Sequence, residues 1–576
     1  MLIILAGILC FFLLFTGIGL VYPFNGLLRK QQREEFFSAF WVGLAVAITL
    51  LQIWHLFSPV NISVLIILTV VSLAGWGMNW RLVRGWLGGV SIGKWLMMAF
   101  ALALTLAVFS IQSIWGQVHF DHGLYHLQMV KWIENYAIIP GLGNLHHRFA
   151  FNNSSFLLVA LINSGPFYGY AYYITSSLLC FVVALRALYS LVRLFLKEGQ
   201  GRLGDVFQAL LFPCVLYYIA TAYFTGYSPD VAVFALQAAL AGELISVFST
   251  VDNDPGSLVR VGIRIVIIAA LSVTVKLSAV VFAATSVLVV LFLLLRKRKV
   301  LDLKAPFVPF SAGAVILLAA GWMLRSVILS GYLLYPSSLI SFDVPWKIPK
   351  SMVDPIAPTI RHWALYRSSA KPDLPLFEWA RVWSGHIPFE VKAGALAIMV
   401  LMVLMAFLKL RQRKRPLEWK GPVVLFGIAV AGLLYWFLSA PDFRFLGAIF
   451  WLLAIAPLLI FYQQLLNGFP KLSPRLLSGL MLVGMILWLR PPLVLEMNKQ
   501  MLVVPPSENA IAAQQVSGGD APFQITTSGL KVYTANDLSK EACWDEPLPC
   551  TRLNDFDHRL YLLNPRDMQE GFAIQE

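Results

Sequence analysis

The residues best suited to chemistry in this chain gather in one short stretch that also holds an aspartate, Asp121. The stretch follows a hydrophobic run that ends near Ile111. Because ionisable groups at a membrane face cost free energy unless they are used, this cluster is a candidate reaction or binding centre. It contains five of the nine histidines of the chain: His119, His122, His126, His146 and His147.

Asp121 is the candidate catalytic residue of this cluster. A carboxylate can accept a proton from a hydroxyl group, and it can also hold a divalent metal such as Mg or Mn together with His122. The first role needs no metal, so metal dependence stays open. The alternative is that these groups only solvate a helix at the membrane surface.

Regular helical spacing predicts which residues of the cluster lie on the same helix face. We expect residues 116–136 to form an interfacial helix with Asp121, Tyr125 and Gln128 on one face. The adjoining face would then carry two histidines that contact substrate, His122 and His126.

Further polar residues lie where other hydrophobic runs end. Asp230 begins a helix, where it either caps free N–H groups or belongs to a site. Lys276 separates two apolar runs and either extends to the interface or binds an anion. Arg325 and Arg444 oppose the usual charge bias of an outer face, and guanidinium groups bind phosphate through paired hydrogen bonds. For Arg444 the alternative is a salt bridge to Asp442.

Two more residues complete the predicted substrate-binding set. His146 follows the helix-breaking stretch that begins at Pro140, and Tyr335 lies in a segment rich in proline and aromatic residues. All these residues are expected on the same membrane face. An acid with several cations suits a reaction in which a lipid-linked phosphate departs, because cations stabilise the developing charge.

The composition is that of a membrane protein. The chain has 576 residues, of which 59% are hydrophobic and 13% charged, against about 25% charged in a typical soluble protein. Its net charge of +14 comes from basic clusters in short loops, which is typical of cytoplasmic loops and excludes a nucleic-acid partner. The clusters are Arg29-Lys30-Arg33, Arg81-Arg84-Lys94, Arg296-Lys297-Arg298-Lys299 and Arg411-Arg413-Lys414-Arg415.

Apolar runs of about 20 residues, long enough to span a bilayer, recur along the chain. We expect an all-α polytopic membrane protein with about 14 transmembrane helices and both termini outside. The predicted helices are 2–22, 36–57, 62–79, 95–112, 168–195, 203–223, 230–250, 260–275, 278–296, 307–329, 390–409, 421–439, 446–464 and 475–490.

Two domains are predicted, a transmembrane domain over 1–494 and a tail over 495–576. The first carries two large outer loops, about 113–167 and 330–389, the second of which is expected to fold over the outer face. The tail has short alternating runs typical of a small β-containing, extracytoplasmic domain. Its Cys543 and Cys550 are expected to form a disulfide, since exported cysteines usually pair.

The pattern resembles the GT-C superfamily of polytopic glycosyltransferases. The resemblance rests on Phe120-Asp-His-Gly-Leu-Tyr-His126 in the first outer loop and on the helix exit from Arg325 to Pro336. The chain has Leu333 where proline is frequent. A second acid beside Asp121 is absent, because its neighbours are Phe120 and His122, so the assignment of the base rests on one residue.

Nearly the full chain is also similar to a poorly characterised group of bacterial membrane proteins linked to surface polysaccharide synthesis. The matching segments are Tyr136–His146, Lys276-Leu-Ser278, Ala440–Phe445 and Cys543–Cys550.

These resemblances imply an inverting sugar transfer from a polyprenyl-phosphate donor to a glycan or lipid-linked acceptor. Asp121 would be the base, Arg325, Arg444 and Lys276 would hold the phosphate, and His122 or His126 would position the acceptor. They imply a role in cell-envelope polysaccharide biosynthesis, at the outer face of the bacterial inner membrane. One alternative is an O-antigen-type polymerase or ligase, which depends mainly on arginine and histidine. A less favoured one is a lipid-linked glycan transporter.

Overall fold

The computed structural model describes most of the chain. The described residues are 1–22, 24–28, 35–88, 91–115, 119–195, 202–221, 224, 226–250, 255–297, 304–366, 375–411, 420–469, 471–493, 522–534 and 542–575. The predicted start of the tail at 495 lies outside them, as do the basic residues at 29–33, 298–299 and 413–415.

The protein is a multi-pass membrane protein. Among the described residues, ten helices are long and apolar enough to cross a membrane, or up to twelve if each of two bent helix pairs is one span. The bent pairs are Ile62–Met78 with Trp80–Trp86, at 70°, and Phe377–Gly385 with Phe389–Val403, at 113°. Two further predicted spans are present as shorter apolar helices, Leu203–Ile219 and Pro474–Leu489.

The helices follow the predicted runs closely along the whole chain. The first group is α1 (Leu2–Gly19), η1 (Phe24–Leu27), α2 (Glu35–Trp54), α3 (Ile62–Met78), α4 (Trp80–Leu87) and α5 (Ile92–Trp115). The first segment predicted to be outer holds η2 (His122–His126), α6 (Leu127–Asn135), α7 (Leu142–Leu145), η3 (His147–Phe151) and α8 (Ser155–Asn163). The central group is α9 (Ala171–Phe195), α10 (Leu203–Ile219), α11 (Pro229–Thr250), α12 (Pro255–Val275), η4 (Leu277–Ala279), α13 (Val280–Lys297) and α14 (Phe307–Ser330).

The second segment predicted to be outer, about 330–389, is irregular over 331–349 and then becomes helical. It contains α15 (Lys350–Val353), α16 (Ile356–Tyr366) and α17 (Leu376–Gly385). The last membrane helices are α18 (Phe389–Arg411), α19 (Lys420–Ser439), η6 (Phe443–Leu446), α20 (Ile449–Gly468) and α21 (Pro474–Leu489).

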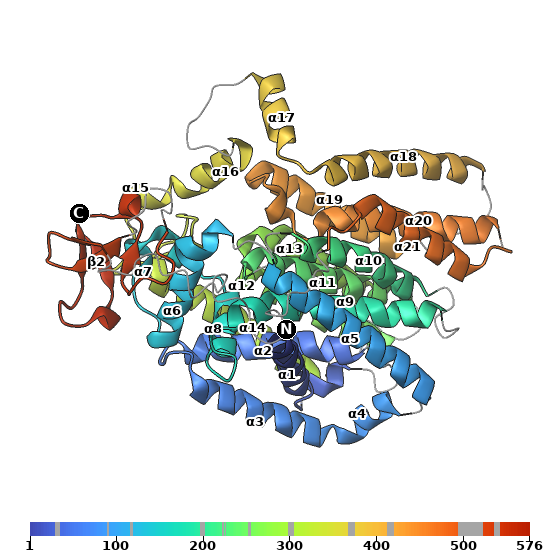
Figure 1. The fold of residues 1–576 in the computed structure, drawn as a ribbon, viewed down its shortest axis with the longest axis horizontal. Coiled ribbons are helices and arrows are strands. Elements are labelled where there is room, and N and C mark those ends of the chain that lie inside the picture. The colour runs from blue at the N-terminus through green and yellow to red at the C-terminus, as the bar shows by residue number, and fades with distance from the viewer. Residues whose placement is uncertain are drawn as a thin grey trace.

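The tail contains the short strands that alternation predicted. β1 (Phe523–Ile525) pairs antiparallel with β2 (Lys531–Thr534), and β2 pairs parallel with β3 (Cys550–Thr551). A second sheet joins β4 (Leu560–Leu562) and β5 (Phe572–Ile574) antiparallel. Figure 1 shows these strands beside α6 and α7, at one end of the helical bundle.

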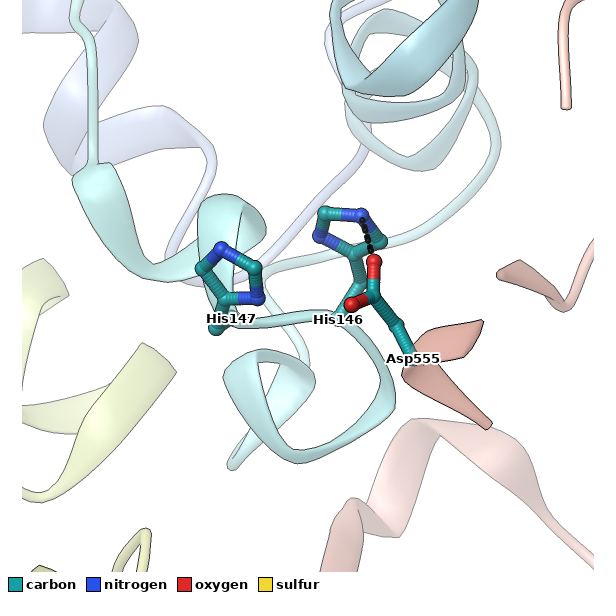
Figure 2. Close-up of side chains that lie close together, drawn as sticks. All are labelled: His146, His147 and Asp555. Atoms are coloured by element: carbon teal, nitrogen blue, oxygen red, sulfur yellow. Dashed lines mark ion pairs between the residues drawn. The ribbon is translucent and has the colours of Figure 1, made fainter. Parts of the chain in front are cut away.

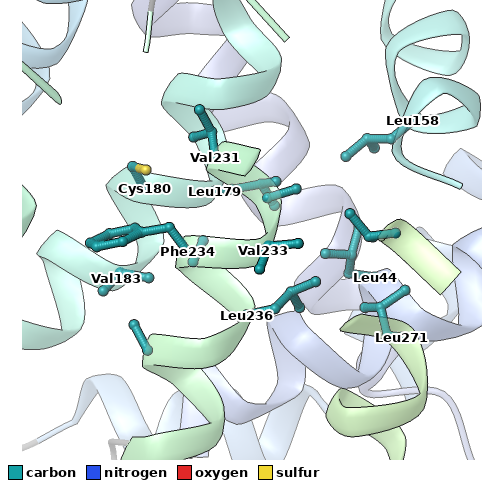
Figure 3. Packing of buried hydrophobic residues seen from close by; sticks show 14 of the residues in the cluster. Leu44, Leu158, Leu179, Cys180, Val183, Val231, Val233, Phe234, Leu236 and Leu271 are labelled. Carbon is teal, nitrogen blue, oxygen red and sulfur yellow. The ribbon is translucent and has the colours of Figure 1, made fainter. Parts of the chain in front are cut away.

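Two features hold the bundle together. Glycines let α1 and α2 approach closely: a Cβ on Gly43 would lie 1.7 Å from the Phe15 carbonyl oxygen, and one on Gly19 would lie 1.8 Å from that of Ala39. Small residues at helix crossings are typical of membrane proteins, in which close packing drives helix association. Elsewhere branched side chains from several helices interlock (Figure 3), as do Leu44 of α2, Leu179 of α9 and Leu271 of α12.

Candidate functional site

Asp121 lies at the start of a helix whose first turn is irregular. The helix begins at Phe120, passes through the π turn η2 and continues as α6. The wider π turn breaks regular helical spacing, so the predicted common face is wrong for Gln128: it bonds to the tail, whereas Asp121 faces Arg444. π turns are rare and often occur at functional sites.

The Asp121 carboxylate is held by three cationic or polar groups. Its Oδ2 accepts a hydrogen bond from Arg444 Nη1 at 2.7 Å, and its Oδ1 lies 3.8 Å from Arg148 Nη1. Arg444 Nη1 also lies 3.1 Å from His119 Nε2. The other ring nitrogen, His119 Nδ1, accepts from the Asp121 backbone N–H at 3.2 Å and lies 3.5 Å from Asp121 Oδ2.

Arg444 is fixed by its own turn and by aromatic rings. Asp442 caps η6, because its Oδ1 accepts from the Arg444 backbone N–H at 3.2 Å, and its Oδ2 lies 3.4 Å from Arg444 Nε. The guanidinium lies 4.6 Å from the Phe445 ring centre and 5.5 Å from that of Trp363 on α16. The salt bridge to Asp442 and the contact with Asp121 therefore coexist, and α16 of the second outer segment covers this group.

A second ion pair also contacts Phe445. Lys276 stands in the extended break between α12 and α13, where its ammonium pairs with Asp230 at the start of α11. The same ammonium lies 4.1 Å from the Phe445 ring centre. Asp230 is not the helix cap, because the Ser228 hydroxyl accepts from the Asp230 N–H at 3.3 Å.

The group has three acids and three bases, so its formal charges balance, and its cations help to control the protonation of Asp121. Burial raises the pKa of its carboxyl, but Arg444, His119, His126 and Arg148 lower it more, so the net pKa lies well below the usual range. Asp121 is thus a permanently ionised acceptor near neutral pH. We call the set the ion-paired cluster; it consists of Asp121, Arg148, Asp230, Lys276, Asp442 and Arg444.

His122 and His126 lie behind Asp121 in a buried aromatic layer. His122 Nε2 accepts from the Tyr227 backbone N–H at 3.0 Å, so its Nδ1 carries the proton and donates to the His119 carbonyl at 3.1 Å. A metal shared with Asp121 would require His122 to give up one of these bonds. Burial, reinforced by His119, lowers the pKa of His122 to about 4. His126 packs against Phe156 and Tyr227.

Tyr125 joins the cluster through its ring. The Arg148 guanidinium lies 5.7 Å from the Tyr125 ring centre, and the ring also packs on Phe151. Burial raises the pKa of the Tyr125 phenol further above its usual value, and the Asp121 charge adds to this. Tyr125 is therefore a neutral neighbour of Asp121.

Arg325 forms a separate polar group. Its Nη1 donates to His55 Nδ1 at 2.6 Å and its Nε donates to Asn152 Oδ1 at 3.2 Å, and only 2% of the residue is exposed. Within the part of the chain that the structure describes, no carboxylate lies in ion-pair range of it. About one turn earlier on α14, Gly321 faces Gln52 of α2, whose buried side-chain amide has no hydrogen-bond partner among the described residues.

One outer segment links the two groups. Arg148 contacts Asp121, and four residues later Asn152 contacts Arg325. The Ser154 N–H then donates to the Thr274 carbonyl at 3.0 Å, two residues before Lys276. Tyr335 packs on Phe151 of the same segment, and its hydroxyl has no partner among the described residues.

His146 pairs with Asp555 of the tail (Figure 2). Its Nε2 lies 3.2 Å from Asp555 Oδ2, and its Nδ1 accepts from the Arg148 backbone N–H at 3.1 Å. Arg552 also donates to both Asp555 oxygens, at 2.7 and 3.0 Å.

His146, His147 and Asp555 bring three ligand atoms within 4.8 Å of one another, a spacing that could hold a metal ion. Two observations favour a structural link instead. The carboxylate is already shared by Arg552 and His146, and a metal on His146 Nε2 would place a proton on Nδ1, where a backbone N–H now donates. The arrangement therefore fits an ion pair that ties the tail to η3.

Sequence reasoning missed several residues that complete these groups. His55 and Asn152 were hidden because they bond to Arg325 across more than 170 positions of sequence. Arg148 and Trp363 were not among the predicted site residues either, although both contact the predicted pair Asp121 and Arg444. Cys543 and Cys550, expected to pair, do form a disulfide, with an S–S distance of 2.09 Å.

The arrangement can accept a proton and bind an anion at neighbouring places. The ion-paired cluster presents an ionised carboxylate beside aromatic rings, and Arg325 presents a buried cation that lacks a countercharge among the described residues. Fold and site define a multi-pass membrane protein with a polar centre built from the ends of its helices and their connecting segments.

The chain belongs to the family described as a domain of unknown function (DUF8201), which it matches over residues 1–451. The match includes the whole ion-paired cluster and Arg325, and it stops before the tail. No curated protein matches the chain, and no solved structure does.

Proposed function

We propose that this protein is a membrane glycosyltransferase of the GT-C type. It transfers a sugar from a polyprenyl-phosphate donor to a glycan or lipid-linked acceptor, with inversion, during cell-envelope polysaccharide synthesis. Asp121 accepts the proton of the acceptor hydroxyl while that oxygen attacks the anomeric carbon. The bond from this carbon to the phosphate oxygen breaks, and the lipid phosphate leaves with the bonding electrons.

The observation that carries this proposal is the ionised carboxylate of Asp121, held at 2.7 Å by Arg444 beside Phe445 and Trp363. Aromatic rings next to a polar group suit a sugar, which has both apolar faces and hydroxyls. A carboxylate with a low pKa is a weak base. An incoming phosphate that draws Arg444 away would raise the pKa of Asp121, so base strength would increase only in the loaded site.

Arg325 is the proposed partner of the donor phosphate. A buried cation without a countercharge is costly, and an anion would relieve that cost. Arg148 contacts Asp121 and Asn152 contacts Arg325, so one short stretch of chain holds both the proposed base and the proposed phosphate ligand. Lys276, Asp230 and Tyr335 would line the sugar or acceptor, while His122, His126 and His146 support the surrounding elements.

The proposed topology has fourteen crossings in the bacterial inner membrane. The ten full-length spans, the two bent pairs and the two shorter helices α10 and α21 supply that number. An even number puts both termini on one side, and the positive-inside bias makes this the extracytoplasmic side. The ion-paired cluster then faces outward, where lipid-linked sugars are used.

One observation favours a second candidate, a polymerase or ligase acting on polyprenyl-diphosphate glycans. Such enzymes depend on arginine and histidine, and Arg325 bonds directly to His55. In that case Asp121 would be structural and Arg325 essential.

Mass spectrometry of lipid-linked intermediates in a deletion strain separates these candidates. The transferase predicts accumulation of a lipid-monophosphate sugar and of a glycan lacking one residue. A polymerase or ligase predicts complete repeat units on a lipid diphosphate instead, and this result would overturn our proposal. Unchanged lipid-linked and surface glycans would overturn both.

A further inference from the structure

The tail packs against the helix that carries Asp121. The disulfide between Cys543 and Cys550 closes a loop in which the Trp544 backbone N–H donates to the Gly123 carbonyl at 2.9 Å. Gly123 lies inside the π turn, two residues after Asp121. The bond therefore joins the tail to the irregular part of this helix.

Close packing between Trp544 and Gly123 accompanies this hydrogen bond. The Trp544 indole lies so close to Gly123 that a Cβ added there would be 2.2 Å from the indole Cε2. Only glycine leaves room for the ring at this position. Trp544 is buried and adopts a φ of +42°, a conformation that non-glycine residues rarely take, so the surrounding contacts hold it there.

The same loop also holds α6. The Gln128 side-chain amide donates to the carbonyls of Trp544 and Glu546, both at 2.9 Å. The Lys131 ammonium donates to Asp545 Oδ1 at 3.0 Å and to the Glu546 carbonyl at 2.8 Å. The loop thus contacts the π turn η2 at Gly123 and the following helix α6 at Gln128 and Lys131, and these contacts fix the π turn relative to α6.

The π turn sets the direction in which Asp121 points. One residue corresponds to a rotation of about 100° in an α-helix. If η2 relaxed to regular α-helix, Asp121 would rotate relative to α6 by about that angle and lose its alignment with Arg444. Holding the π turn open thus keeps the carboxylate in the ion-paired cluster.

We propose that the disulfide-closed loop 543–550 is a clamp that holds the π turn and thereby orients Asp121. Trp544 and Gln128 are positioning residues: they touch neither substrate nor reacting atoms. The structural part of this inference stands alone, whereas its consequence for turnover rests on the proposed function.

The structural part is tested by hydrogen exchange and mass spectrometry on the purified full-length protein. In Trp544→Ala, exchange of amides in 122–131 should become about tenfold faster or more, because the bond and the packing are lost. Trp544→Phe should restore part of the protection. The matched control is Phe523→Ala, which removes an exposed tail aromatic whose ring packs on Lys531. Wild-type protection at 122–131 in Trp544→Ala would overturn the clamp.

A second variant covers the case in which Trp544→Ala unfolds the tail, which exchange in 523–534 would reveal. Gln128→Met keeps the length of the side chain, removes both bonds and leaves the tail residues intact. It should also speed exchange in 122–131, with unchanged exchange in 523–534. Unchanged exchange in both segments would overturn the proposal.

The functional part uses glycan transfer in the complemented strain. A displacement of about 1 Å at a reacting group lowers the rate about 10²-fold, so Gln128→Met should lower kcat with little change in KM. Faster exchange with an unchanged kcat would overturn the positioning role. If no sugar transfer occurs even with wild type, the proposed function fails while the exchange result still decides the clamp.

Discussion

The structure allows the coupling free energy between Asp121 and Arg444 to be predicted. Their side chains are 19% and 10% exposed, and the charged atoms are 2.7 Å apart. At an effective dielectric constant of about 20 this distance gives about 6 kcal/mol of attraction, an upper bound that desolvation reduces. Close, partly buried pairs couple by about 1.5–7 kcal/mol in double-mutant cycles. We expect a coupling near 3 kcal/mol.

The assay is a double-mutant cycle with Asp121→Asn and Arg444→Met, read as the free energy of unfolding in mixed micelles. Each single variant removes the nearest partner of a mostly buried charge and leaves only a longer ion pair, Arg444 with Asp442 or Asp121 with Arg148, so it should destabilise by up to about 3–5 kcal/mol. The double variant should be more stable than the sum of the single changes predicts, by the coupling energy.

Arg148 supplies the matched control. It belongs to the same cluster, but it lies 3.8 Å from Asp121 and is 28% exposed. Its cycle with Asp121→Asn should give at most about 1 kcal/mol, as for exposed pairs. Equal couplings for Arg148 and Arg444, or additive effects for Arg444, would refute the reasoning.

Three further predictions concern residues around the candidate site and the tail. Burial lowers the folded-state pKa of His122 to about 4. The contribution of this neutral histidine to stability is therefore complete above the unfolded pKa, about 6.5, and falls by about 1.4 kcal/mol per pH unit down to about 4. The melting temperature of His122→Gln should fall less steeply with acid than that of wild type, and parallel curves would contradict this. Gly226→Ala should destabilise by about 1–3 kcal/mol, since its φ is +120° and the new Cβ would lie 2.1 Å from His122 Nε2; Gly204→Ala, where nothing lies within 4 Å, is the control for the same melting measurement. Chelation with EDTA should leave the melting temperature unchanged, because Arg552 already pairs with Asp555; a loss of stability that Zn²⁺ reverses would identify a metal at His146 instead.

Much of the fold could be predicted because its causes are local. Apolar runs marked the membrane helices, alternation marked β1 and β2, and two cysteines in the tail, which was predicted to be exported, marked the disulfide. The count of full spans was less predictable, since hydropathy does not show the 70° and 113° bends that divide two of the runs.

The site was only partly predictable because most of its contacts are distant in sequence. Asp121 and Arg444 were both expected, and the structure brings them together across 323 positions. His122 and His126 were expected to face substrate, but they fill a buried layer because the π turn redirects that part of the helix. Arg325 was expected beside Arg444, yet it bonds to His55, a partner that no local pattern indicates.

The most direct test of the central claim is the glycan made by Asp121→Asn in the native host. Surface and lipid-linked glycans are compared by mass spectrometry in a deletion strain that expresses wild type, Asp121→Asn or Asp343→Asn, an exposed outer-loop acid, at matched levels. Loss of a general base lowers rates about 10²–10⁴-fold, so Asp121→Asn should give a glycan lacking one sugar while Asp343→Asn restores the full structure. A normal glycan in Asp121→Asn would show that this carboxylate is structural and would contradict the account.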